Sequence, residues 1–326
     1  MKKLKIHLVS IIMNKKQITS ILLMLTATLI WGTSFVAQTD STKYMGPLTF
    51  MAARSFVGAF ALLLVILIRN RIKKRHSENS ENKNIQLKRI ILIGLICGGA
   101  IALATGLQQW GIYYNSSILG IDTSGKGGFL TATYIIFVPI FSLFFKKSSS
   151  ISIFFGAALG FLGMYLLCIG DGFFITLGDV LLIGCALAFT VHILVIDLMC
   201  KDIEPILLSF IQFLVAGLIL TPISILTERN IAVSLGSVIF QIIYLGVFSS
   251  AIAYTIQIVI QKNLHPAVAS LIMSFESVFA TIAGAIFLNE KMTFQQIIAC
   301  IVIFLGMIVA QFGEYIIKFF KSRFHS

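Results

Sequence analysis

Long runs of apolar residues follow one another along the chain, and short polar or basic segments separate them. About 20 apolar residues at 1.5 Å each cross a hydrocarbon core about 30 Å thick, so each run is long enough for one membrane-spanning helix. The runs are continuous, whereas the strands of a membrane barrel alternate apolar and polar residues. We therefore predict an all-α integral membrane protein with ten transmembrane helices. The predicted spans are residues 18–39, 47–68, 90–112, 125–145, 151–170, 177–198, 206–226, 236–260, 264–288 and 294–313.

Composition supports this interpretation. Of the 326 residues, 58% are hydrophobic and only 12% are charged, and the mean hydropathy is +0.97. A soluble domain needs more charge than this on its surface, so we expect the lipid bilayer to surround the protein. The spans leave almost no residues for a separate domain.

Basic residues indicate the orientation of the chain. Twenty of its 25 lysines and arginines lie in segments that ten spans would place on the same side as the N-terminus. Cytoplasmic loops carry such an excess, so we expect a protein of the cell (cytoplasmic) membrane with both termini in the cytoplasm. Residues 1–17 and 314–326 are then basic cytoplasmic ends. This placement also explains the net charge of +12 without a nucleic-acid partner.

The N-terminal segment superficially resembles a signal peptide, because lysines precede an apolar run. The run is longer than the 7–15 apolar residues of a signal peptide, so we interpret it as the first span. Met1 and Met13 are both plausible translation starts, since the span needs nothing before Met13.

The chain also contains a weak internal repeat. Its two halves align at an offset of 158 that falls to 152 and then to 143, and each fall occurs across a predicted loop. The offset of 158 matches Pro47 with Pro205, Trp31 with Phe189 and Arg54 with Gln212. Each half, residues 18–170 and 177–313, would hold five spans, and an odd number inverts the second half. Inverted repeats around a site at the membrane midplane recur in transporters; a duplication without moving parts is the alternative.

Two charged residues lie well inside predicted spans, away from the span ends. Arg54 is about seven residues into the second span, and Glu276 is near the middle of the ninth. An unpaired charge there costs from about 2.5 to more than 10 kcal/mol, so both must face protein or water. We expect Glu276 to contact a cationic group of a solute or a coupling proton, and Arg54 to contact an anionic group. The alternative is a static buried pair or network that holds helices together.

Four further side chains are candidates for the same site. Trp31, Gln108 and Tyr134 would line an aromatic, weakly polar cavity. His192 could titrate near neutral pH, although a lone histidine among apolar neighbours is more often a hydrogen-bonded packing residue. Lys126, where the fourth span begins, is expected to be solvated.

Several kinds of chemistry have no signal in the sequence. There is no phosphate-binding loop, no nucleophile elbow and no zinc-protease motif. The cysteines lack the paired spacing of a metal site. We therefore predict no enzymatic activity, no cofactor and no metal. The five cysteines are Cys97, Cys168, Cys185, Cys200 and Cys300.

Small residues recur every three or four positions in the third, fifth and ninth spans. Close backbone approach supplies much of the packing energy between helices in lipid, so these residues are expected to pack the bundle. They are Gly94, Gly98, Ala102, Gly106, Gly156, Gly160, Gly163, Ala280 and Gly284.

Three segments carry a resemblance to a known family. They are Trp31 to Val36, Thr123 to Ala132, and Ser274 to Glu276 with its continuation to Glu290. In this order, and with ten spans in two inverted halves, the chain resembles the EamA branch of the drug/metabolite transporter superfamily over roughly residues 18–313. The resemblance implies a two-repeat carrier with a central cavity that moves metabolites such as amino acids or drug-like solutes, often outward.

Individual positions follow from that resemblance. Trp31, Glu276 and Glu290 match recurrent family positions, and Lys126 matches the basic residue that opens the fourth span. Many relatives have proline after the mid-helix glutamate, where this chain has Ser277. The ninth span is therefore expected to be straighter than in those relatives.

These observations favour a secondary transporter that exports a small metabolite, amino acid or drug-like solute by alternating access. The expected partners are the small-molecule solute and the lipid bilayer. A monomer is sufficient because one chain holds both halves, and a homodimer is compatible with this. The alternatives are a membrane-embedded enzyme that acts on lipid and a non-transporting scaffold subunit.

Overall fold

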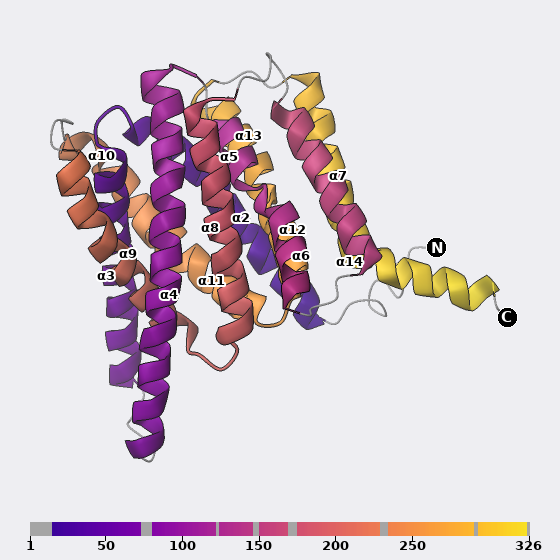
Figure 1. Ribbon diagram of the computed structural model, residues 1–326, viewed down its shortest axis with the longest axis horizontal. Helices are drawn as coiled ribbons and strands as arrows, with labels where there is room; N and C mark the ends of the chain where they lie inside the picture. Colours follow the sequence, from indigo (N-terminus) through magenta and orange to yellow (C-terminus); the bar gives the residue numbers. More distant parts are fainter. Residues whose placement is uncertain are drawn as a thin grey trace.

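The computed structural model describes residues 15–72, 80–121, 124–145, 150–168, 175–228, 234–289 and 293–324. These residues form a bundle of helices (Figure 1) and contain no strand, which confirms the all-α prediction. The first half contains α2 (Lys15–Ser41), α3 (Pro47–Ile72), α4 (Ser80–Tyr113), the π-helical segment η1 (Tyr114–Ile118), α5 (Ser124–Thr131), α6 (Tyr134–Phe144) and α7 (Ile151–Cys168). The second half contains α8 (Leu177–Met199), α9 (Pro205–Thr227), α10 (Leu235–Tyr244), the π-helical segment η2 (Leu245–Ala253), α11 (Tyr254–Gln261), α12 (Pro266–Met273), α13 (Phe275–Phe287) and α14 (Phe294–Phe324).

Eight helical stretches in the described part of the chain are long and apolar enough to cross a membrane. They correspond to eight of the ten predicted spans. Two shorter apolar helices, Ile151–Leu166 and Ile297–Ala310, lie where the fifth and tenth spans are expected. The count of ten therefore stays a prediction.

The ninth span is not continuous, although it carries Ser277 rather than a proline after Glu276. The span breaks at Ser274 into α12 and α13. Three serine hydroxyls on this segment donate to the carbonyl oxygen three residues back, at 3.0 Å from Ser270, 2.7 Å from Ser274 and 2.8 Å from Ser277. Such bonds compete with the helical backbone pattern. Serines can thus interrupt a membrane helix without a proline.

The fourth span is also broken, between α5 and α6 at Ala132 and Thr133. The Thr133 hydroxyl donates to the Leu130 carbonyl at 2.6 Å, and the backbone turns through bonds of three-residue spacing. Pro139 does not mark this break, because it lies inside α6. Discontinuous helices of this kind occur where the backbone faces protein or a cavity rather than lipid.

Helix contacts relate the two halves. Helix α2 packs against α13, and its counterpart in the second half, α8, packs against α5 and α6. Helix α3 packs against η2, and its counterpart α9 packs against α4. Two further pairs, α3 with α9 and α7 with α14, join corresponding helices of the two halves. A helix of the first half thus contacts the elements of the second half that correspond to those that its aligned helix in the second half contacts in the first.

Glycines bring several of these helices together, as the small-residue spacing predicted. A Cβ added at Gly98 would lie 2.6 Å from the Cβ of Val215 in α9, and one at Gly156 would lie 2.6 Å from the Gly306 carbonyl in α14. Helices α2 and α13 also come close together at Gly32, where an added Cβ would lie 2.3 Å from the Cβ of Phe279.

We expect Gly32→Ala to lower the melting temperature of the detergent-solubilised protein. The new methyl group would overlap Phe279 and the Ala280 backbone nitrogen, and overpacking costs about 1–3 kcal/mol. Gly99→Ala is the control, because its added Cβ meets nothing within 4 Å. It should leave the melting temperature unchanged or raise it slightly, since alanine favours helix by about 1 kcal/mol. Equal melting temperatures for the two variants would contradict the close approach.

Candidate solute site

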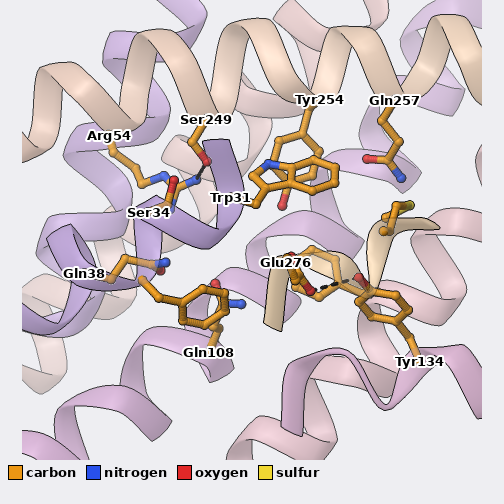
Figure 2. A pocket seen from close by; sticks show the side chains of 13 residues that line it. Trp31, Ser34, Gln38, Arg54, Gln108, Tyr134, Ser249, Tyr254, Gln257 and Glu276 are labelled. Atoms are coloured by element: carbon orange, nitrogen blue, oxygen red, sulfur yellow. Dashed lines mark hydrogen bonds between the residues drawn. The ribbon is translucent and has the colours of Figure 1, made fainter. Parts of the chain in front are cut away.

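A cavity lined by buried residues lies within the bundle, with about 400 Å³ of atom-free space that includes some open solvent. Helices α2, α3, α4, α6, α8, α11, α12 and α13 and the segment η2 all contribute to its wall (Figure 2). It is lined by Trp31, Ser34, Phe35, Gln38, Arg54, Gln108, Tyr134, Phe189, Ser249, Tyr254, Gln257, Met273 and Glu276. The cavity therefore collects five of the six candidate residues from separate parts of the sequence.

Glu276 lies in the first turn of α13, directly after the break in the ninth span. Its side chain is buried, and the Tyr134 hydroxyl donates to its Oε1 at 2.8 Å. Tyr134 is the first residue of α6, so this bond joins the two broken spans immediately after their breaks. Among the described residues, no lysine, arginine or histidine nitrogen lies within 4.0 Å of the carboxylate.

Arg54 is buried in α3 on another wall of the cavity. Its Nη2 donates to the Ser249 hydroxyl at 2.9 Å, and its Nε donates to the Ser250 hydroxyl at 3.2 Å. These partners are neutral, and no carboxylate in the described ranges lies within 4.0 Å of the guanidinium. Figure 2 shows Arg54 at the upper left and Glu276 near the centre of the view, below the Trp31 ring. Arg54 and Glu276 do not form an ion pair with each other.

Aromatic rings form the rest of the wall. Trp31 meets Tyr254 edge to face with ring centroids 5.0 Å apart, and Tyr134 meets Phe189 in the same way at 6.5 Å. Such pairs hold flat apolar surfaces at fixed angles. The wall is thus suited to contact the apolar part of a small solute.

Three polar atoms on the lining residues have no hydrogen-bond partner in the described part of the protein. They are Nε1 of Trp31, Oε1 of Gln38 and Oε1 of Gln257. Most buried polar atoms in proteins are paired. A donor and two acceptors that all border one cavity are therefore available to a ligand or to water.

Gln108 contributes to the same wall from α4. Its Nε2 donates to the Thr131 hydroxyl at 3.2 Å, which connects α4 to the last residue of α5. The bond holds the amide in place beside the break in the fourth span.

His192 does not line the cavity. Its ring lies edge to face with the ring of Tyr254, at a centroid distance of 6.0 Å. The Tyr254 ring in turn contacts Trp31. Its Nε2 lies 3.1 Å from Oε1 of Gln212. The structure thus places His192 one layer behind the cavity wall, as a buried, hydrogen-bonded packing residue.

Lys126 is not solvated, contrary to the sequence-based expectation. Its Nζ lies 2.7 Å from Oδ2 of Asp179, and its side chain is only 19% exposed. The sequence offered no sign of this pair because 53 residues separate its members. Glu290, the other family-matched residue, lies outside the described residues.

Sequence reasoning missed several lining residues, among them Ser34, Gln38, Ser249, Tyr254 and Gln257. A usable signal was present in the first span. Residues three, four and seven positions apart share one helix face, so Ser34 and Gln38 lie on the face of Trp31. Positions in η2 were harder to predict, because a π-helical segment shifts the register of the residues after it.

Comparisons with known proteins agree with this architecture. The model of the EamA-like transporter family matches residues 18–169 and 176–311. An uncharacterized transporter of Archaeoglobus fulgidus is 26% identical over 287 residues, which cover 86% of this chain and 82% of that protein. The uncharacterized transporter YoaV of Bacillus subtilis is 23% identical over 294 residues, which cover 88% of this chain and 95% of that protein.

A solved crystal structure shares the fold. It superposes with a TM-score of 0.70 at 18% sequence identity, over 90% of this chain and 96% of the other. Together with the family match over both halves, the helical fold and the buried cavity, this identifies the protein: the chain belongs to the EamA-like transporter family and is a multi-pass membrane protein of the transporter type.

Proposed function

We propose that the protein is a secondary transporter that moves a small zwitterionic solute, such as an amino acid, across the cytoplasmic membrane by alternating access. The observation that carries this proposal is the pair of opposite charges in one cavity. Arg54 and Glu276 line the same buried space, and neither has an ionic partner among the described residues.

The energetics of buried charge favour a ligand with two charges. An uncompensated charge in the interior costs several kcal/mol, and a solute with a carboxylate and an ammonium group could compensate both. The carboxylate would pair with Arg54, whose planar guanidinium suits bidentate contact. The ammonium group would pair with Glu276, whose hydrogen bond from Tyr134 is made at Oε1. The aromatic rings that line the same cavity would contact the apolar part of the solute.

We further propose ten spans in two inverted halves, residues 18–170 and 177–313, with both termini cytoplasmic. The exchanged helix contacts support this arrangement. The breaks in the fourth and ninth spans also support it. The offset of 143 aligns Thr133, at the break in the fourth span, with Glu276, next to the break in the ninth. Rocking of two such halves would expose the cavity to each face in turn. Export is the direction that the sequence resemblance favours, and Glu276 is the proposed site of proton coupling.

A thermal-shift screen of the detergent-purified protein tests the proposal. Amino acids, nucleosides, sugars and cationic drugs would be added over a range of concentrations. We expect at least one zwitterionic solute to raise the melting temperature progressively, because a ligand that binds only the folded state stabilises it by RT ln(1 + [L]/Kd).

The screen contains its own controls. The amide of the best amino acid lacks its negative charge, and the N-acetyl form lacks its positive charge, while both keep the side chain. Each should stabilise the protein much less than the parent amino acid. Equal shifts from all three would contradict recognition of both charges. No shift with any solute, in folded protein, would favour the scaffold or the lipid-acting enzyme.

A further inference from the structure

A second buried charge cluster lies outside the solute site. Lys126, in the first turn of α5, and Asp179, in the first turn of α8, form the ion pair described above, and the Asp179 side chain is only 2% exposed. Neither residue lines the cavity. We call this pair and its hydrogen-bonding neighbours Asn115 and Thr176 the Asp179 clasp.

The clasp connects three spans at one end of the bundle. The Asn115 amide, in η1 just beyond α4, donates to Oδ1 of Asp179 at 2.9 Å. The Thr176 backbone N–H donates to Oδ2 of Asp179 at 2.9 Å, and its hydroxyl donates to Oδ1 of Asn115 at 2.6 Å. Asp179 therefore caps α8 and at the same time holds α5 and the end of α4. In Figure 1, α5 and α8 both reach the upper end of the bundle here.

Helix α5 extends from this clasp to the cavity. A Cβ added at Gly127, next to Lys126, would lie 3.5 Å from the ring of Phe35, which lines the cavity. At its other end α5 carries Thr131, the hydrogen-bond partner of the lining residue Gln108. Helix α5 thus connects the clasp to two residues of the cavity wall, Phe35 and Gln108, and the clasp fixes where α5 begins.

The positions that the repeat aligns with Lys126 and Asp179 carry no charge. The offset of 143 aligns Lys126 with Ala269, and the offset of 158 aligns Asp179 with Ile21. Both partners are apolar, so the corresponding helices at the opposite end cannot form this ion pair. The opposite end carries a different ion pair, in which Arg69 of α3 lies 2.6 Å from Glu204, the residue that caps α9.

We propose that the Asp179 clasp is the lock of one gate: it closes the cavity toward the end of the bundle where α5 and α8 begin, and it separates when the cavity opens there. This inference rests on the proposed alternating-access function. In the proposed orientation this end is extracellular. The clasp would then stabilise the conformation that is closed to the outside, and the empty protein would rest in that conformation.

Chemical labelling of the cavity tests this directly and needs no solute. Ser34 lines the cavity and is 2% exposed. In a variant with Ser34→Cys and the five native cysteines replaced by serine, a membrane-impermeant maleimide would be added to intact cells. We expect slow labelling when the clasp is intact. Addition of Lys126→Met, which removes the ion pair but retains the cap of α8, should raise the labelling rate from outside about tenfold or more.

A matched control is Asp40→Asn. Asp40 lies at the same end of the bundle and accepts a hydrogen bond from Gln241 at 2.8 Å, but it joins α2 to α10 rather than α5 to α8. It should leave the labelling rate unchanged. Asp179→Asn, which also weakens the helix cap, should act in the same direction as Lys126→Met. An effect of Asp179→Asn without one of Lys126→Met would overturn the lock and indicate loss of the cap alone.

Sidedness separates a gate from a damaged fold. Inside-out vesicles expose the other face to the same maleimide. A rise from the extracellular side only supports the lock, while a rise from both sides, from the cytoplasmic side only, or from neither overturns it. Because no solute is involved, a clear one-sided rise together with a silent thermal-shift screen would leave the lock standing and count against the proposed solute.

Discussion

Replacement of Glu276 by glutamine will abolish stabilisation by the solute and yet will not lower the stability of the empty protein. Glutamine keeps the shape of the side chain and an oxygen that can accept the 2.8 Å bond from Tyr134. It removes a buried charge that has no ionic partner in the described chain. Because such a charge is costly, the melting temperature without solute should stay the same or rise.

Loss of the charge should weaken solute binding strongly. Truncation of one partner of a buried ion pair costs about 2–5 kcal/mol, which corresponds to about a 30-fold or larger increase in Kd. Solute flux into proteoliposomes should fall accordingly, and an imposed pH gradient should no longer change it. A variant that retains both the thermal shift and the response to the pH gradient would rule out Glu276 as the binding and coupling residue.

Arg54→Gln is expected to remove recognition of the negative charge of the solute. The repeat offset aligns Arg54 with Gln212, so glutamine is the residue that the second half already carries at the corresponding position. It can still donate to Ser249, which accepts from Arg54 at 2.9 Å. The parent amino acid should bind about 30-fold or more weakly to the variant.

The amide of the same amino acid provides the decisive comparison. It lacks the carboxylate, so its weak binding should be nearly the same in the wild type and in Arg54→Gln. A variant that weakens the amide and the amino acid equally would show that Arg54 supports the fold of the site rather than contacting the carboxylate. Thermal shifts over a concentration range measure both affinities.

The helical fold was predictable because a span in lipid must satisfy its own backbone hydrogen bonds, and long apolar runs leave few other solutions. The charged site residues were predictable for a related reason. Arg54 and Glu276 stand out in apolar segments, where an ionisable side chain is rare. Trp31 and Tyr134 were found among the polar aromatic residues of two other spans.

Contacts between distant residues were not predictable from one sequence. Nothing in the spacing shows that Lys126 pairs with Asp179, or that Tyr134 bonds Glu276 from 142 residues away. The break at Ser274 was missed for another reason. Serine is common in membrane helices and usually returns its hydroxyl bond to the same helix, so sequence alone does not show when three such bonds interrupt it.

The bond between Tyr134 and Glu276 has a consequence for how a solute could drive motion. It joins α6 and α13 within two residues of the interruptions in their spans, and both side chains line the cavity. An ammonium group that approached Glu276 would compete with the Tyr134 hydroxyl at the joint itself. In such a carrier the binding site and the interrupted helices are in direct contact. The bound solute would therefore act directly on the helix breaks at which the protein would bend to release it.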